Sequence, residues 1–140
     1  MASTTTKVVI LDKPSDWEPW LFIVKTIADG GDTWRYLHPD LDTEPVVPNR
    51  PRMPTSTDVN PEKPTLLALD AAEKETYNLL LTVYKEDLAI TKQVLDTIQS
   101  VRKHIVSSIS SNNIVYINDK TSIFQMLVAL KKRLAPIDYI

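Results

Sequence analysis

The fold of this chain is decided by the stretch TLLALDAAEKETYNLLLTVYKEDLAITKQVLDTIQSVRKHIVSSI, residues 65–109. Proline and glycine are absent from this stretch and from the residues that follow it as far as Ala135. The larger side chains, all but Thr91 apolar or aromatic, recur in it at steps of three and four, the spacing of one helix face. The repeat consists of Tyr77, Leu80, Tyr84, Leu88, Thr91, Leu95, Ile98, Val101, Ile105 and Ile109.

This spacing predicts one long helix over residues 67–109, unless a bend or a break divides it into two helices. Read without a break from Leu69 to Ile109, it would extend roughly 60 Å at 1.5 Å per residue. Most helices of globular proteins have about 11–12 residues. Because a single helix cannot bury its own apolar stripe, the remaining segments must supply the other side of a bundle.

A first, shorter helix is predicted at residues 16–29. Ser15 or Asp16 can cap its beginning, and Gly30-Gly31 can end it by supplying positive φ. The following segment, up to Leu37, is expected to form a short turn of helix laid back on the core.

A last helix is predicted at residues 120–134. Asp119 or Thr121 opens it, and Pro136 stops it. Its buried face is expected to consist of Ile123, Phe124, Leu127, Leu130 and Leu134.

Proline dominates the segment between the first helix and the long one. Seven of the ten prolines fall within residues 38–64, which predicts an extended connector. A PxxP-type ligand for a partner domain is the alternative to a plain linker here. The chain is thus expected to be an all-α helical bundle over residues 15–140, preceded by a flexible arm over residues 1–14. Within that arm, Val8–Leu11 are expected to form either a short strand or an extended segment that packs on the bundle. We expect its core to be anchored by Trp17, Trp20, Trp34, Tyr77, Tyr84, Leu88, Phe124 and Leu127.

Composition excludes several classes of protein. The 140 residues contain no cysteine, so disulfides, thiolate metal sites and a Cys nucleophile are all excluded. We expect an intracellular, cytoplasmic protein. The sequence begins with neither a signal peptide nor an apolar stretch long enough to span a bilayer, so no membrane partner is expected.

Charge is unevenly distributed along the sequence. Residues 1–90 carry nine Lys and Arg against fifteen Asp and Glu, whereas residues 91–140 carry seven against three. This asymmetry suggests either head-to-tail association or weak phosphate contact, or it is the random charge of a solvated surface. Lys131, Lys132 and Arg133 in the last helix are candidate contacts for RNA or a partner, with a solvated helix end as the alternative.

No catalytic, cofactor or metal motif is present. The two glycines are adjacent, so neither a dinucleotide-binding nor a P-loop glycine pattern can be formed. His38 and His104 have no second ligand at metal spacing, and both are expected to be solvated. We therefore expect a protein that is not an enzyme and that binds no cofactor, metal or small-molecule substrate.

Two segments resemble a known family. SDWEPWLFIVKTIADGGDTWRYL, residues 15–37, resembles the opening of Gag polyproteins from copia-type LTR retrotransposons, with Trp17, Trp20 and Trp34 in the places of the family's aromatic residues. The region from Tyr77 to Arg102, followed by IVYINDKTSIFQMLVALKKRLAPID, is similar to the fungal branch of the same family. These motifs are packing patterns rather than catalytic signatures.

The resemblance implies a structural protein that self-associates into virus-like particles enclosing the element's RNA. This chain would be the N-terminal, all-helical part of the capsid region. Members of the family normally continue into further helices and often a zinc knuckle, so we expect a fragment or a truncated, domesticated copy. The alternatives are a helical protein–protein interaction module and a weak RNA-binding domain.

Overall fold

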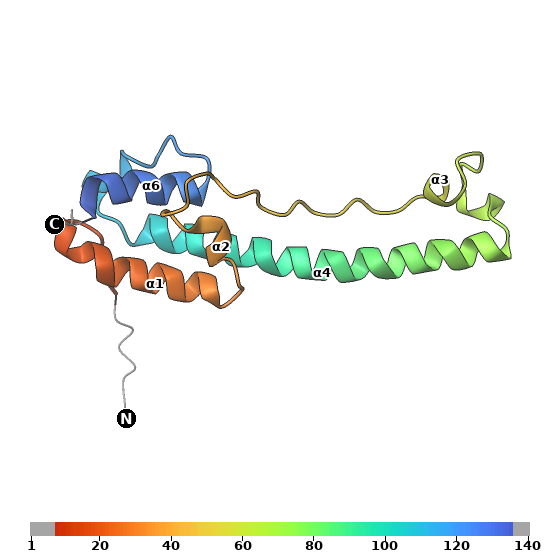
Figure 1. The fold of residues 1–140 in the computed structure, drawn as a ribbon, viewed down its shortest axis with the longest axis horizontal. Helices are drawn as coiled ribbons and strands as arrows, with labels where there is room; N and C mark the ends of the chain where they lie inside the picture. The colour runs from red at the N-terminus through yellow and green to blue at the C-terminus, as the bar shows by residue number, and fades with distance from the viewer. Residues whose placement is uncertain (1–7, 136–140) are drawn as a thin grey trace, which may run out of the picture. The chain divides into compact units, whose positions relative to one another are not determined.

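The computed structural model describes residues 8–135. These residues form helices, turns and extended segments without a β-strand, and their one β-type pairing is an isolated bridge between Leu11 and Ile109. The predicted all-α fold is therefore confirmed (Figure 1). The chain divides into two compact units. The terminal unit combines the residues up to Val47 with those from Asp96 onward, and the middle unit is Pro48–Leu95.

The long helix, α4, runs unbroken from Ala71 to Ser107 over 37 residues, which corresponds to roughly 55 Å. It begins later than the predicted residue 67 because Leu66–Ala68 form a separate 3₁₀ turn. Asp70 and Glu73 then form a reciprocal cap, in which each carboxylate accepts the other residue's backbone N–H, at 2.8 and 3.0 Å. This arrangement satisfies donors that the first helical turn leaves without partners.

Leu11 holds the N-terminal segment on the bundle. Its N–H donates to the Ser108 carbonyl at 2.8 Å, and its own carbonyl accepts the Ser110 N–H at 3.0 Å. Its side chain is completely buried. Within the arm predicted over residues 1–14, the expectation that Val8–Leu11 pack on the bundle is confirmed at Leu11, whereas flexibility does not hold there because a fully buried leucine anchors the chain. Residues 1–7 of that prediction lie outside the described residues.

Helix α1, Trp17–Asp29, agrees with the predicted range of 16–29 and follows a 3₁₀ turn at Pro14–Asp16. Its buried residues are spaced by three and four, as one helix face requires. They are Trp17, Trp20, Val24 and Ala28.

The turn after α1 corrects the role assigned to the two glycines. Neither has positive φ, and the left-handed residue is Asp32, with φ of 55°. Gly31 is needed for a different reason. A Cβ built on it would lie 2.1 Å from the Thr97 Oγ1 atom, so only glycine allows this turn to approach α4 so closely.

Three further helices complete the terminal unit. These are α2, Trp34–Leu37, α5, Ser111–Ile114, and α6, Ile123–Leu134. Helix α6 begins at Ile123 rather than residue 120 because the Ser122 hydroxyl caps it, accepting the Gln125 N–H at 3.2 Å.

The buried face of α6 differs from the prediction at one position. Phe124 is only half-buried and lies outside the core cluster, whereas Met126 is buried. Both residues fit a step of three or four from other core positions, so spacing alone could not separate them. Met126 is buried and Phe124 is not because α6 turns the side that carries Met126 toward the core of the terminal unit.

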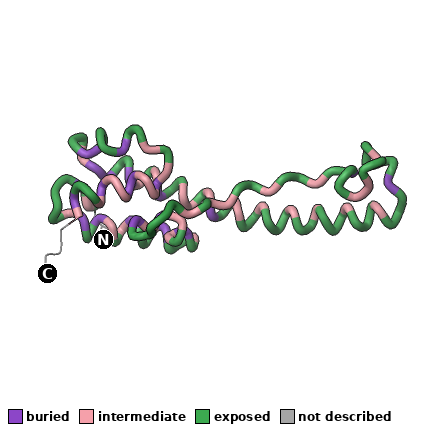
Figure 2. Tube along the Cα trace, turned by 45° about the horizontal axis from the view of Figure 1, so that its top comes forward, coloured by how far each residue is buried: buried purple, intermediate pink, exposed green. Residues whose placement is uncertain are grey.

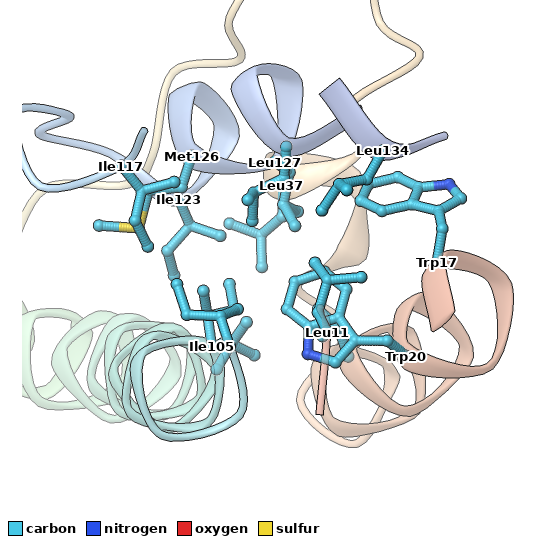
Figure 3. Packing of buried hydrophobic residues seen from close by; sticks show 14 of the residues in the cluster. Leu11, Trp17, Trp20, Leu37, Ile105, Ile117, Ile123, Met126, Leu127 and Leu134 are labelled. Atoms are coloured by element: carbon cyan, nitrogen blue, oxygen red, sulfur yellow. The ribbon is translucent and has the colours of Figure 1, made fainter. Parts of the chain in front are cut away.

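The core of the terminal unit gathers side chains from the N-terminal segment, α1, α2, α4 and α6, which point toward one another (Figure 3). Trp17, Trp20 and Leu127 are buried in this core, and Trp34 packs against it half-buried. The other buried members are Leu11, Val24, Ala28, Leu37, Val101, Ile105, Ile109, Ile117, Ile123, Met126, Leu130 and Leu134.

The middle unit pairs the first part of α4 with the proline-rich connector and the short helix α3, Ser56–Val59. This helix corrects the prediction that residues 38–64 are extended throughout, because Thr55 and Asp58 form a capping box in a stretch without proline. The Tyr77 hydroxyl donates to the Pro54 carbonyl at 3.5 Å. Glu73 accepts a hydrogen bond from Asn60 Nδ2 at 2.8 Å and forms an ion pair with Lys63. The hydrogen bond from Lys63, with help from the Asp70 N–H and Asn60, lowers the pKa of Glu73 from 4.5 to about 2.

The middle unit has little buried surface (Figure 2). Tyr77, Tyr84 and Leu88, which were predicted as core anchors, are only half-buried there. These three residues lie on the apolar face of α4 that the sequence predicted. They are not fully buried because, within this unit, no second helix with a large apolar face covers them. The buried residues of this unit are Ser56, Leu69 and Val94.

Candidate functional site

The basic last turn of α6 is largely engaged within the fold. Lys131 forms an ion pair with Asp40, and the hydrogen bond from Lys131 lowers the pKa of the Asp40 carboxyl below its usual value. Arg133 donates from Nε to Asn113 Oδ1 at 3.2 Å, and its guanidinium lies 3.9 Å from the centre of the Tyr116 ring.

Lys132 alone of these three predicted contacts has no ion-pair or aromatic partner within residues 8–135, and it is exposed. Three neighbouring cations in the sequence therefore do not form one convergent patch in the structure. Phosphate binding benefits from several cations directed at the same anion, which this arrangement does not provide.

Asn113 was missed as a structural residue by sequence reasoning. Its buried amide donates to the carbonyls of Leu11 and Asp12, both at 3.1 Å, and its Oδ1 accepts from Arg133. It thereby joins the N-terminal segment to α6. The sequence offered no signal for this role, because Asn113 lies in a run of serines and asparagines, whose side chains compete for backbone hydrogen bonds and favour turns and loops in general.

The two histidines differ in environment, and the expectation that both are solvated is wrong for His104. Its Nε2 atom is buried and has no hydrogen-bond partner within the described residues. This burial lowers the pKa of His104 below its ordinary value of 6.5. His38 stacks on Trp34 with ring centroids 5.2 Å apart, and its Nδ1 accepts the Asp40 N–H at 3.2 Å.

No cluster of three His, Asp or Glu side chains that could hold a metal ion occurs in residues 8–135. Over the same residues, no helix combines the length and apolar character needed to cross a bilayer.

A depression of about 440 Å³ in the terminal unit lies beside α1. Trp17, Leu21 and Phe22 contribute apolar walls, while Lys25 and the Lys131–Asp40 pair contribute charge. Charges of both signs surround the opening, so it does not select an ionic ligand. Its chemistry is that of a general surface hollow rather than of a reactive site.

The connector does not present its prolines as a PxxP ligand would. Pro48, Pro51 and Pro54 are half-buried, whereas Asn49, Arg50, Arg52 and Met53 between them are exposed. Domains that bind PxxP segments contact the prolines themselves. Prolines at every third residue lie on one edge of a polyproline II helix. Here that edge is the less exposed one, which favours the structural role of a linker.

One exposed apolar surface of the middle unit lies on α4. Leu79, Val83 and Ile90 are 69, 53 and 65% exposed, respectively. Their steps of four and seven place them on one helix face. This face was missed because the stripe through Tyr77 accounted for the helical spacing. The signal that could have revealed it is that residues 79–83 are apolar on more than one side of the helix.

Comparison with family models, with curated proteins and with solved structures found no match. The similarity to Gag polyproteins therefore rests on the residues quoted above.

Proposed function

We propose that this chain is a structural, Gag-like capsid module that acts by self-association and is not an enzyme. In this role it would contribute the N-terminal helical part of a retrotransposon particle that encloses RNA. The observation that supports self-association is the exposed apolar face Leu79, Val83 and Ile90 on a single 37-residue helix. Exposed apolar side chains gathered on one face of a helix are typical of association surfaces.

Direct RNA binding by the last turn of α6 receives less support. Lys131 and Arg133 already interact with Asp40, Asn113 and Tyr116. A phosphate that bound these cations would have to compete with the partners they already have. RNA contact is therefore secondary to protein contact in this proposal.

Light scattering coupled to size exclusion tests the proposal over a wide concentration range. We expect the average mass to rise with concentration, and particles or ordered assemblies to be visible by electron microscopy at the highest concentrations. A strict monomer throughout would contradict the proposal and would favour the alternative of an interaction module for a different protein.

A further inference from the structure

The apolar face of α4 is bordered by acidic residues. At about 100° per residue, Glu75 and Glu86 lie within about 40° of Leu79, and Asp87 lies about 80° from it. All three are exposed. The lysines of this part of the helix occupy a different edge, about 120–140° from Leu79; they are Lys74, Lys85 and Lys92. We refer to Leu79, Val83 and Ile90 with Glu75, Glu86 and Asp87 as the acidic stripe.

A second surface of the chain has the opposite charge. Lys120, Phe124, Val128 and Lys132 recur every fourth residue and line a shallow depression of about 290 Å³ on α6. Phe124 and Val128 are half-buried and lie outside the core cluster, and Lys132 is exposed. The Lys120 Nζ atom also forms an ion pair with Asp119 Oδ1, at 3.8 Å. We refer to these four residues as the basic ridge.

We propose that the acidic stripe of one copy binds the basic ridge of a second copy, an interface that rests on the self-association proposed above. Apolar side chains lie at the centre of both surfaces, and carboxylates on one would face ammonium groups on the other. Pairing two acidic stripes would instead bring Glu75, Glu86 and Asp87 close to their own equivalents. Like charges in such a position are repulsive.

The pairing of two different surfaces has a consequence for assembly. Each copy that uses its stripe still has an unused ridge, so the contact is head-to-tail and can extend beyond a dimer. A surface of this size is expected to bind weakly on its own, and repetition of the contact strengthens the assembly as a whole.

Two blocked variants test the pairing. Val83→Gln/Ile90→Gln removes two apolar side chains from the acidic stripe. Val128→Gln/Lys132→Gln removes one apolar side chain and one cation from the basic ridge. Glutamine keeps helix propensity and adds no charge. The matched control is Lys85→Gln/Lys92→Gln, which changes the opposite edge of α4. Circular dichroism and thermal midpoints show whether each variant keeps the fold of the parent. If Val128→Gln unfolds the chain, Lys120→Gln/Lys132→Gln is used as the ridge variant instead.

Light scattering from about 10 μM to about 1 mM measures the association. The dissociation constant of each blocked variant should be at least tenfold higher than that of the parent. The control variant should associate as strongly as the parent. An equimolar mixture of the two blocked variants should then form a species of twice the mass of one chain and nothing larger. In that species the intact stripe of one variant binds the intact ridge of the other.

Three outcomes would overturn the pairing. A ridge variant that associates as the parent does, or a mixture that stays monomeric, would mean that the chain self-associates through other surfaces, and the capsid-like proposal would survive. A parent that is monomeric across the whole range would overturn both proposals together.

Discussion

At the scale of single residues, a buried chain of hydrogen bonds joins α1 to the end of α4. Trp20 Nε1 donates to the Ser108 hydroxyl at 2.8 Å, and that hydroxyl donates to the His104 carbonyl at 2.6 Å. Trp20 and Ser108 are both buried. The serine therefore satisfies the polar atom of a large aromatic side chain that would otherwise be costly to bury.

Trp20→Ala should destabilise the fold by roughly 3–5 kcal/mol, because it removes a completely buried aromatic side chain and leaves a cavity. Urea unfolding followed by circular dichroism measures the change. Phe22→Ala on the same helix is the control, since Phe22 is 70% exposed and its loss should matter little. A loss below about 1 kcal/mol for Trp20→Ala would contradict the placement of Trp20 in the core.

His104 should make stability depend on pH. Its pKa in the folded state lies below 6.5 because of burial, so the unfolded chain binds more protons as the pH falls through 6.5 toward the folded pKa. The stability contributed by neutral His104 is therefore present above pH 6.5 and lost on acidification. Thermal midpoints between pH 7 and pH 5 should fall more for the parent than for His104→Gln. Equal slopes, or an NMR titration of His104 above 6.5, would refute this.

At the scale of elements, the closest approach between the turn after α1 and α4 depends on the missing side chain of Gly31. The nearest atoms to a built Cβ all belong to Thr97, at 2.1–2.8 Å. Because real Cβ atoms do not come this close to other atoms, any substitution must displace one of the two segments. The contact therefore fixes how the end of α1 is positioned along α4 within the terminal unit.

Gly31→Ala should cost about 1–3 kcal/mol through this overlap. The double variant Gly31→Ala/Thr97→Ala should cost less than the sum of the two single variants, because it removes the overlapping atoms. Gly30→Ala serves for comparison: its Cβ would lie 3.2 Å from the Ile27 carbonyl oxygen, a much milder contact. Strict additivity in the double variant would rule out the overlap as the cause.

At the scale of the whole molecule, the two compact units differ in how much they bury. The terminal unit contains fifteen buried core residues, whereas the middle unit has Ser56, Leu69 and Val94 as its buried residues. Buried apolar contacts are the main source of resistance to local opening. The two ends of α4 therefore differ in packing, because one end lies in a well-packed core and the other in a unit with few buried residues.

Hydrogen exchange should reveal this difference within α4. Amides at residues 98–106 should be protected at least tenfold more, or about 1.4 kcal/mol, than amides at residues 75–92. Mass spectrometry of peptides from the two regions provides the measurement, at a protein concentration low enough to keep the chain monomeric. Equal protection in both regions would show that the middle unit is as stable as the terminal one.

Much of the fold could be predicted from the sequence because helix signals are local. The bounds of α1 follow from apolar spacing and from the cap and glycine signals at its two ends. A long helical run after residue 67 follows from apolar spacing and from the absence of proline, whereas only the structure shows that this run is a single helix. The candidate surfaces could not be predicted in the same way. Val83 and Tyr84 are neighbours in the same apolar run, yet Val83 is exposed and Tyr84 is half-buried in the fold.

The sequence by itself determined the helical class, the extended connector and the absence of cysteine chemistry, since each depends on residue type and near-neighbour spacing. Tertiary structure decided which of several apolar faces became core, that Met126 rather than Phe124 is buried, and that Lys131 and Arg133 have partners within the fold. The physical reason is that burial and ion pairing depend on residues distant in sequence, such as Asp40 beside Lys131. Periodicity describes a single helix and carries no information about what covers it.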